Sequence, residues 1–434
     1  MDSPLRLGIA GLGTVGASVA KRLIERAAQF AARSGRPIAV AAVSARDAGR
    51  DRGVDLSAAT FFDDPVKLAA KGEIDVFVEL MGGSEGPALE AVKAALQRGL
   101  PVVTANKALL AHHGVSLAKL AQRKGTTIFF EAAVAGGIPI IKTLRESLAG
   151  NSVSRVYGIL NGTCNYMLTR MEKEGIAFDD CLKDAQRLGY AEADPTFDIG
   201  GFDAAHKLAL LTSLAFGCEI DLDSVFIEGI SAISNDDIKA AAELGYRIKL
   251  LAVAQRTESG IEQRVHPTMI PASSALAQVD GVTNAVAVDT DLLGSILLVG
   301  PGAGGNATAS AVLADIVDIA VGSATPTFSV APSDLVPYKK ARMRAHEGGY
   351  YIRLSVLDRV GAFASIARRM AENGISLDSI VQRKPQGSRD EETAPVVLIT
   401  HETTEAAVRK ALDGLSRDGH LAGEPRMIRI EPLD

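Results

Sequence analysis

The sequence has no tryptophan and only three cysteines, Cys164, Cys181 and Cys218. An odd number of thiols without Cys-x-x-Cys spacing indicates neither a disulfide framework nor a zinc site. The sequence also lacks an excess of positive charge. It has 46 lysines and arginines against 52 aspartates and glutamates, which gives a formal net charge of −6. Proteins that bind nucleic-acid phosphates normally carry a basic excess, so we expect no nucleic-acid partner.

Long apolar runs are missing as well. No uninterrupted run reaches the ~18 residues of a membrane-spanning helix. The N-terminus "MDSPLRLGIAGLG" leads directly into a strand-like pattern, without the basic region and long apolar core of a signal peptide. We therefore expect a reducing, cytoplasmic setting and no membrane partner. Hydrophobic residues make up 47% of the chain, which predicts a globular protein. Its length of 434 residues predicts two to four domains.

The first third of the chain alternates short β-branched segments with amphipathic helical patterns, which is typical of βαβ units and a parallel sheet. The sequence therefore predicts an α/β fold whose residues 1–135 form a Rossmann-type nucleotide-binding domain. The predicted strands are residues 5–13, 38–44, 75–81, 101–107 and 126–132.

The remaining chain divides into four further parts. Residues 136–299 mix strands and helices and predict an α+β domain. Residues 300–322 form a glycine-rich turn and an apolar helix that could return to the first domain. Residues 323–347 are broken by prolines and are interpreted as a linker, and residues 348–434 predict a separate small α/β module of ferredoxin-like type.

A glycine-rich turn, "GLGTVG", joins the first predicted strand to the first helix. In this setting Gly11 makes the tight turn, Gly13 lets the backbone approach a pyrophosphate and Gly16 lets the helix pack closely on the strand. Thr14 and Val15 open the helix, whose N-terminus would face the phosphates. A plain structural turn is the alternative, but the strand, turn and helix in series favour a dinucleotide site.

The nucleotide preference is expected at the end of the second strand. An acidic residue there would bind the ribose hydroxyls of NAD. Instead, Arg46 is placed to pair with a 2′-phosphate, which favours NADP. NAD stays possible because Asp47 follows directly, and Arg46 and Arg50 could equally form an ordinary solvated edge.

Two short segments, residues 81–83 ("MGG") and 104–110 ("TANKALL"), follow predicted strand ends. Ligands of such sheets collect at the carboxyl ends of the strands, so we expect Thr104, Ala105 and Lys107 at the cofactor cleft. Lysine is electrostatically disfavoured at a helix N-terminus, which favours a functional reason for Lys107 over a chance surface position.

Residues 189–211 place several acids ahead of Lys207 in a helix that is otherwise almost wholly apolar. A helix that is apolar all round is buried. Asp203 and Lys207 are four residues apart, the favourable order for an ion pair on one helix face. Burial lowers the pKa of a lysine and fits it to exchange a proton with a hydroxyl group. A satisfied structural ion pair is the alternative.

The chain resembles homoserine dehydrogenase, in the longer form that carries a C-terminal ACT domain. The resemblance runs from the start of the chain to about residue 322, and its most specific part is "AEADPTFDIGGFDAAHK". The matching segments are "GLGTVG" (11–16), "TANKALL" (104–110), "EAAVAGGIPII" (131–141), "NGTCNYML" (161–168), "GYAEADPTFDIGGFDAAHKLALL" (189–211) and "GPGAGGNATASAVLADI" (300–316).

The resemblance implies interconversion of L-homoserine and L-aspartate 4-semialdehyde with NAD(P), in threonine, methionine and isoleucine biosynthesis. It implies that Lys207 exchanges the proton, with Lys107 as its partner in the cleft. Asp198 would support Lys207, while Glu192 and Asp203 would hold the amino acid.

By the same resemblance, Gly189 would lie against both substrate and cofactor, with Tyr190 beside the substrate. Gly302 and Gly304 would lie against the cofactor.

The resemblance also implies a monovalent-cation site, with sodium as the expected ion. Its ligands would be the carboxylate of Glu131 and the main-chain carbonyls of Val134, Gly136 and Ile138. A glycine-rich domain crossover without an ion is the alternative.

For the C-terminal module the resemblance implies feedback by an amino acid such as threonine, although Val360 stands where the ACT pattern typically has proline. The module could instead only hold subunits together. The resemblance further implies a homo-oligomer, a dimer or tetramer built through the middle domain. Two rival functions remain open from the residues: an NAD(P)-dependent dehydrogenase acting on another amino alcohol or hydroxy acid, and a regulatory sensor without catalysis.

Overall fold

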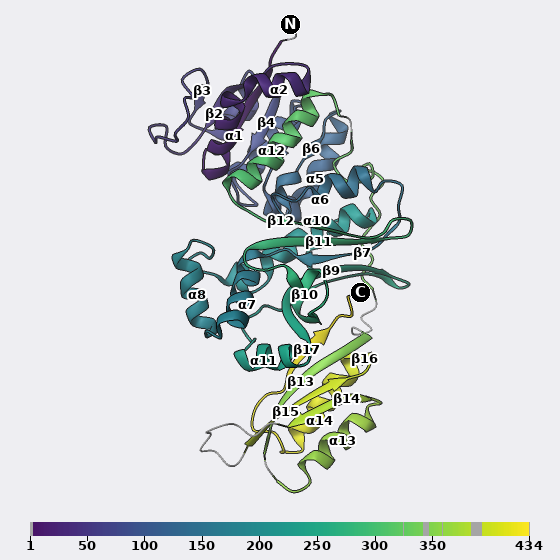
Figure 1. Cartoon of the computed structure of the whole chain (residues 1–434). Helices are drawn as coiled ribbons and strands as arrows, with labels where there is room; N and C mark the ends of the chain where they lie inside the picture. The colour runs from purple at the N-terminus through teal and green to yellow at the C-terminus, as the bar shows by residue number, and fades with distance from the viewer. Residues whose placement is uncertain (1–2, 324, 342–346, 358, 383–392, 434) are drawn as a thin grey trace.

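The computed structural model describes residues 3–323, 325–341, 347–357, 359–382 and 393–433. Its N-terminal sheet has six parallel strands in the order β3-β2-β1-β4-β5-β6 (Figure 1). The order reverses between β1 and β4, the kind of switch point at which such sheets bind ligands. The strands are β1 (Leu5–Ala10), β2 (Ile38–Ser44), β3 (Thr60–Phe62), β4 (Val76–Glu79), β5 (Val102–Thr104) and β6 (Ile128–Phe129).

Helices cover both faces of this sheet, and one of them comes from much later in the chain. Helix α12 packs on α1, and both contribute to one apolar core with β1. The chain therefore does return to the first domain, as its glycine-rich turn suggested. The helices are α1 (Thr14–Glu25), α2 (Ala27–Ser34), α3 (Pro65–Lys71), α4 (Pro87–Gln97), α5 (Lys107–Arg123) and α12 (Gly305–Ala320).

Four of the five predicted strands were too long, because β1 and β4 also end before the predicted bounds, at Ala10 and Glu79. The segment predicted as residues 101–107 is a strand only over β5, because the side chain of Asn106 accepts a hydrogen bond from the amide of Leu109 and starts α5. The segment 126–132 is a strand only over β6, because a short 3₁₀ turn, Glu131–Ala133, follows it. In both cases polar groups at the strand end bond to the next element instead of to the sheet.

The middle of the chain forms a mainly antiparallel sheet with helices packed against it, and the short strand β8 pairs in parallel with β10. The strands are β7 (Val153–Ile159), β8 (Phe226–Ile227), β9 (Tyr246–Thr257), β10 (Gly260–Pro271), β11 (Thr283–Thr290) and β12 (Gly294–Pro301). The helices are α6 (Ile140–Lys142), α7 (Gly162–Glu174), α8 (Phe178–Arg187), α9 (Thr196–Ile199), α10 (Phe202–Phe216) and α11 (Asn235–Glu243), with short turns at Thr143–Ser147 and Leu276–Gln278.

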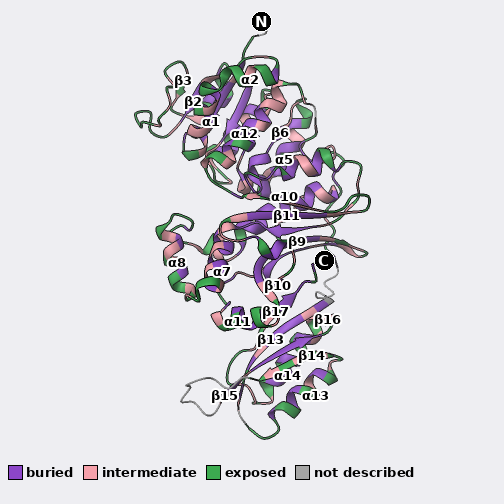
Figure 2. Ribbon diagram, in the orientation of Figure 1, coloured by how far each residue is buried: buried purple, intermediate pink, exposed green. Residues whose placement is uncertain are grey.

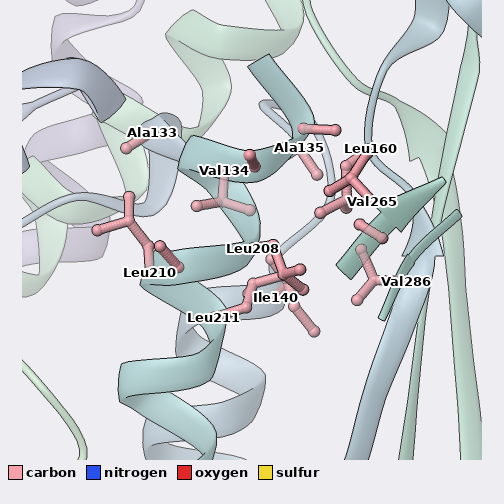
Figure 3. Close-up of a cluster of buried hydrophobic side chains, with 14 of the residues drawn as sticks. Ala133, Val134, Ala135, Ile140, Leu160, Leu208, Leu210, Leu211, Val265 and Val286 are labelled. Carbon is pink, nitrogen blue, oxygen red and sulfur yellow. The ribbon is translucent and has the colours of Figure 1, made fainter. Parts of the chain in front are cut away.

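Helix α10 is the centre of the largest core. Almost all of its residues are buried, as its lack of a polar face predicted. Leu208 and Leu211 lie beside Ile140 and the crossover residues that follow β6, and strand residues such as Val286 complete the cluster (Figure 3). Apolar contact on every side leaves the charged residues at the start of α10 in a largely dry setting.

The C-terminal module was predicted to be separate, and the structure modifies this. It has its own core (Figure 2), but β17 pairs with β13 on one side and with β10 of the middle sheet on the other, so the strands join into one eleven-stranded sheet. Its elements are β13 (Glu347–Leu357), α13 (Ala362–Glu372), β14 (Leu377–Gln382), β15 (Thr393–Thr400), β16 (Thr403–Thr404), α14 (Glu405–Arg417) and β17 (Arg426–Ile430).

A buried carboxylate fastens this module to the middle sheet. Asp237 at the start of α11 is 1% exposed, and it accepts hydrogen bonds from Arg353 Nε at 2.6 Å and from the hydroxyl of Tyr351 at 3.2 Å. Ser234 also donates to it from its amide and hydroxyl. A buried charge needs such partners, because removing one leaves it poorly solvated.

In the described part of the chain, no helix is long and apolar enough to cross a bilayer.

Replacing Arg353 with methionine should therefore lower the free energy of unfolding by about 2 kcal/mol, at the low end for a broken buried pair because Ser234 and Tyr351 still donate. Equilibrium urea unfolding measures this. Arg426→Met, at an exposed position in the neighbouring strand β17, is the matched control and should change stability by less than about 0.5 kcal/mol. Equal losses in the two variants would contradict the role given to Asp237.

Candidate active site

The glycine-rich turn has the geometry expected of a dinucleotide site. Gly11 has φ +98°, and a β-carbon there would overlap the carbonyl of Leu80. A β-carbon on Gly16 would overlap the carbonyl of Gly11, so helix and strand approach closely only without one. Helix α1 begins after Gly13 with no side-chain cap and no acid in its first turn. Its free amides therefore suit an anionic pyrophosphate.

The return helix completes this cradle. A β-carbon on Gly305 would lie 2.8 Å from Thr14 Cγ2, so the start of α12 rests against the start of α1. Gly304 has φ +113° and precedes α12, while Gly302 packs against the side chain of Asn284. The structure thus brings the turn at residues 302–304 beside the residues predicted to bind the cofactor.

Arginines gather near the end of β2. Arg46 follows the strand and is exposed. A cavity of about 400 Å³ beside the glycine-rich turn is lined by Leu12, Arg50 and Arg52 among others, and Arg46 is not one of its described lining residues. Arg52, which the sequence analysis did not single out, donates to the carbonyl of Leu12 at 3.3 Å. This edge therefore carries three arginines, together with Asp47 and Asp51.

A small polar platform at the strand ends positions Lys107. Glu79, fully buried at the end of β4, accepts from the hydroxyl of Thr104 at 2.6 Å and from the amide of Met81 at 2.7 Å. The hydroxyl of Thr104 accepts from the amide of Asn106, which caps α5. Glu79 and Asn106 were missed by the sequence analysis, although a glutamate closing a buried strand is a recognisable signal. Together they place Lys107 at the first residue of α5.

Asp203 lies between the two lysines. Its Oδ1 is 3.0 Å from Lys107 Nζ and its Oδ2 is 2.7 Å from Lys207 Nζ. Lys207 also donates to the carbonyl of Leu160 at 2.7 Å. Lys207 and Asp203 have side-chain exposures of 10% and 8%, whereas Lys107 is 31% exposed. The cluster is therefore enclosed on the side of α10 and open on the side of α5.

Asn161 ties the acids together and was not predicted as a site residue. Its amide nitrogen donates to Asp198 Oδ1 at 2.9 Å and to Asp203 Oδ2 at 3.0 Å, while its oxygen accepts from the amide of Cys164 and caps α7. Asp198 was expected to support Lys207. Its side chain accepts from Asn161, and its charge opposes the fall in the pKa of Lys207 without a hydrogen bond to it among the described contacts.

Burial and charge shift the pKa values of this cluster in opposite directions. The two lysines hold the pKa of Asp203 well below its usual range despite its burial. Burial lowers the pKa of Lys207, which the charge of Asp203 only partly opposes. Burial raises the pKa of Asp198. His206, also missed by the sequence analysis, lies edge-on to His112 and Phe197, and burial lowers its pKa to about 4. The histidine is therefore neutral near pH 7.

Three predicted substrate residues lie apart from this cluster. Glu192 is exposed, and its main-chain carbonyl accepts from Gln186. Gly189 and Tyr190 are exposed as well, and the Tyr190 ring packs on Tyr166 with centroids 5.0 Å apart. Among the described contacts, none joins Glu192 to either lysine or to Asp203.

The predicted cation loop has a buried carboxylate at its start. Glu131 accepts from the amides of Ile141 at 3.0 Å and Lys142 at 2.8 Å, and burial raises its pKa to about 7. Ala135 and Gly136 have φ values of +51° and +28°, which bend the loop sharply. The carbonyl of Ile138 already accepts from Ile140. Within the described ranges, no group of three or more His, Cys, Asp or Glu side chains could hold a metal.

Comparison with known proteins agrees with this geometry. Residues 139–317 match the family described as homoserine dehydrogenase, residues 11–131 match its NAD-binding domain and residues 350–417 match the ACT domain. A homoserine dehydrogenase of Neisseria gonorrhoeae is 44% identical over 99% of both chains. The chain belongs to the homoserine dehydrogenase family.

Solved structures give the same result. A homoserine dehydrogenase from Thiobacillus denitrificans aligns over 100% of this chain and 99% of its own with a TM-score of 0.93 and 43% identity. A hyperthermophilic archaeal homoserine dehydrogenase in complex with NADPH aligns over 75% of this chain and 100% of its own, with a TM-score of 0.64 and 29% identity.

The expected fold class and activity are therefore confirmed. The chain is an oxidoreductase that interconverts L-homoserine and L-aspartate 4-semialdehyde with a nicotinamide cofactor, and it carries an ACT domain. A family shared over the full length leaves no case for a non-catalytic sensor or for a dehydrogenase of plain hydroxy acids. The close glycine turn and the uncapped N-terminus of α1 fit the cofactor.

Asn161→Ser should lower kcat/KM for homoserine about tenfold, because serine can cap α7 but cannot donate to both acids. Asn161→Ala should lose the same activity and also about 1 kcal/mol of stability, since alanine removes the cap. Steady-state kinetics and thermal unfolding of the two variants separate these effects. Unchanged kcat/KM in the serine variant would show that Asn161 only caps the helix.

Proposed function

We propose that Lys207, Lys107 and Asp203 form the proton-transfer centre for homoserine oxidation. The observation that carries this proposal is the carboxylate of Asp203, which contacts both lysines in a largely buried setting. A nicotinamide cofactor held at the glycine-rich turn would supply the acceptor for the hydride that leaves the carbinol carbon of homoserine. The hydroxyl proton passes to Lys207, and the C–O single bond becomes the carbonyl of the semialdehyde.

The electrostatics of the cluster suit this role. Burial lowers the pKa of Lys207, so a larger fraction of it is neutral and able to accept a proton at a given pH. Asp203 remains ionised, since its pKa is depressed, and holds both ammonium groups in place. Lys107 is partly exposed and can pass the proton toward solvent. In the reverse direction, the protonated Lys207 supplies the proton to the forming alkoxide.

Substrate recognition is proposed for the neighbouring acids. Glu192, with Gly189 and Tyr190, lies in the exposed loop between α8 and α9, and Asp198 lies at the end of α9. Closure of this loop over bound homoserine would bring a carboxylate to its ammonium group. Asp203 is already paired with two lysines. Its main proposed role is therefore to hold these lysines, and contact with the substrate is its second role.

For the cofactor we propose NADP over NAD. Support comes from the exposed Arg46 after β2, from Arg50 and Arg52 in the neighbouring cavity, and from the NADPH in the archaeal relative. Arg46→Ala should raise the KM for NADPH severalfold and leave the KM for NADH unchanged. Equal KM values for the two nucleotides in the unsubstituted enzyme would remove the preference.

We also propose a monovalent cation, sodium, at Glu131 with the carbonyls of Val134, Gly136 and Ile138. The sharp bend at residues 135–136 supports it, because such a bend can turn successive carbonyls toward one point. Thermal unfolding in sodium, potassium and choline chloride at equal ionic strength tests the site. No difference among the salts would leave the loop as a plain crossover.

A homo-oligomer, dimer or tetramer, is proposed on the edge strand β12. Leu292, Leu293 and Val299 on this hairpin are 77%, 57% and 53% exposed, which is unusual for large apolar side chains at a sheet edge. Light scattering of the purified protein gives the size of the oligomer.

The three free, buried thiols support our proposal of a reducing cytoplasmic setting.

For the ACT domain we propose an amino-acid effector, with threonine as the first candidate. Val360 is fully exposed on the loop that leads into α13, and Gly361 with φ +92° caps that helix. Asp358 in the same loop lies outside the described residues. Calorimetric titration of the full chain with threonine tests the effector.

Lys207→Ala should lower kcat for homoserine oxidation by at least about a hundredfold, the usual contribution of a positioned base. We expect kcat of the unsubstituted enzyme to rise with pH below the ordinary lysine value of 10.5, because the lowered pKa of Lys207 frees the neutral amine there, and the variant should lose this rise. NADPH binding followed by fluorescence should be unchanged. Lys239→Ala, on the exposed face of α11, is the matched control. Wild-type kcat in the Lys207 variant would exclude it as the proton acceptor.

A further inference from the structure

Asn284 is a buried polar residue at the edge of the lysine cluster. It lies in strand β11 and is 1% exposed, and its side-chain amide donates to the main-chain carbonyl of Leu160 at 3.1 Å. The same carbonyl accepts a hydrogen bond from Lys207 at 2.7 Å. A single oxygen atom therefore connects the amide of Asn284 to the ammonium group of Lys207.

The carboxamide of Asn284 uses its donor but not its acceptor. Its Oδ1 atom is buried and has no hydrogen-bond partner among the described residues. Unpaired buried acceptors are rare because they are destabilising, and a leucine would fill nearly the same space without one. Stability alone therefore does not explain an asparagine at this position, whereas a need for its donor toward Leu160 does.

The flat side of the same carboxamide supports the turn that precedes α12. A β-carbon on Gly302 would lie 2.1 Å from Asn284 Cγ, 2.2 Å from Nδ2 and 2.3 Å from Oδ1. Because these three distances are nearly equal, Gly302 faces the plane of the carboxamide and not its edge. Only glycine allows so close an approach. The turn at residues 302–304 thus rests on the side chain that reaches the carbonyl bound by Lys207.

Sharing one carbonyl has an electrostatic consequence for Lys207. The amide hydrogen of Asn284 carries a partial positive charge and points at the same oxygen as the ammonium group. The oxygen is therefore a weaker partner for the charged lysine than an unshared one would be. Burial already lowers the pKa of Lys207. The amide of Asn284 acts in the same direction and favours the neutral amine.

The charged groups that face Lys207 come from three helices. They are Asp203 on its own helix α10, Lys107 on α5 and Asp198 on α9. Cys164 on α7 lies near them, but burial raises the pKa of its thiol well above the ordinary value, so the thiol stays neutral. Among the described contacts, none of these groups bonds to Asn284. A substitution of Asn284 therefore changes the shared carbonyl and leaves the charged groups in place.

We propose that Asn284 is a further positioning residue of the reaction. Its amide holds the Leu160 carbonyl that Lys207 also uses, and its flat side supports the turn at Gly302. One side chain of β11 thereby sets the proton acceptor on α10 and the start of α12 relative to each other. The first part rests on the proton-transfer role proposed for Lys207, whereas the support of the turn does not.

Asn284→Leu keeps most of the volume and removes the donor. Homoserine oxidation needs the neutral Lys207, so the rise of its rate with pH should move up by about 0.5 pH unit or more, a loss of about threefold within that range. Semialdehyde reduction needs the protonated lysine, so its rate should not fall in the same range. Single-turnover absorbance of NADPH measures both directions. Damage to the fold would instead slow both directions at every pH.

Gly302→Ala tests the support of the turn by binding alone. Its β-carbon overlaps the carboxamide of Asn284, so NADPH binding, followed by fluorescence, should weaken at least about fivefold. Adding Asn284→Ala removes the overlapping atoms, and the double variant should regain most of the lost affinity. No recovery in the double variant would overturn the proposed support.

Val286→Ala is the matched control. Val286 lies two residues further along β11 and is equally buried, but it has no polar group (Figure 3). Its substitution should lower thermal stability without moving the pH dependence of either direction. Thermal unfolding verifies that each variant folds, and Asn284→Ala takes the place of the leucine variant if that one does not.

The outcomes separate this inference from the proton-transfer role itself. Wild-type rates in Lys207→Ala would overturn that role, and the recovery of NADPH affinity would then still decide whether Asn284 supports the turn. An inactive Lys207→Ala together with an unmoved pH dependence in Asn284→Leu would overturn the positioning of Lys207 by Asn284 and leave the proton-transfer role intact.

Discussion

The contact of Asp203 with two lysines is the interaction on which the site depends. Three charges gathered in a largely dry place are tolerated only when they are paired and hydrogen-bonded, because the desolvation of each ion is costly. Asp203 pairs with both lysines, and Asn161 donates hydrogen bonds to Asp203 and Asp198. The carbonyl of Leu160 accepts a further hydrogen bond from Lys207. Removing Asp203 would leave Lys207 buried without its carboxylate partner, so the cluster depends on the surrounding fold to hold this acid in place.

This support comes from two domains that meet at the edge of the parallel sheet. Glu79 and Thr104 fix the strand ends from which α5 starts, and the core around α10 fixes the opposite side. Lys107 therefore approaches Asp203 from the nucleotide domain while Lys207 approaches it from the substrate domain. The lysine that we propose as the proton acceptor therefore lies on one side of the Asp203 contact, and the domain with the glycine-rich turn lies on the other.

The ACT domain is attached more firmly than a linker would allow. Strand β17 adds its main chain to β10, and Glu431, just beyond it, pairs with Arg155 at 2.9 Å and Arg264 at 3.1 Å in the middle domain. The small strand β8 pairs with β10 near this joint, and its Ile227 packs against Gly201 ahead of α10.

The sequence by itself determined the features that depend on local spacing. The Gly11–Gly16 turn, the burial of α10 and the pairing of Asp203 with Lys207 follow from residues a few positions apart, whose relative geometry a helix or a tight turn fixes. The α/β class and the ACT domain were likewise evident from periodicity and from the resemblance. Only the tertiary structure decided that Asp203 also meets Lys107, that Asn161 and Glu79 order the site, that Glu192 stays exposed and that β17 joins two domains into one sheet. Those contacts join segments far apart in the chain, and no local rule fixes how far apart such segments come to lie.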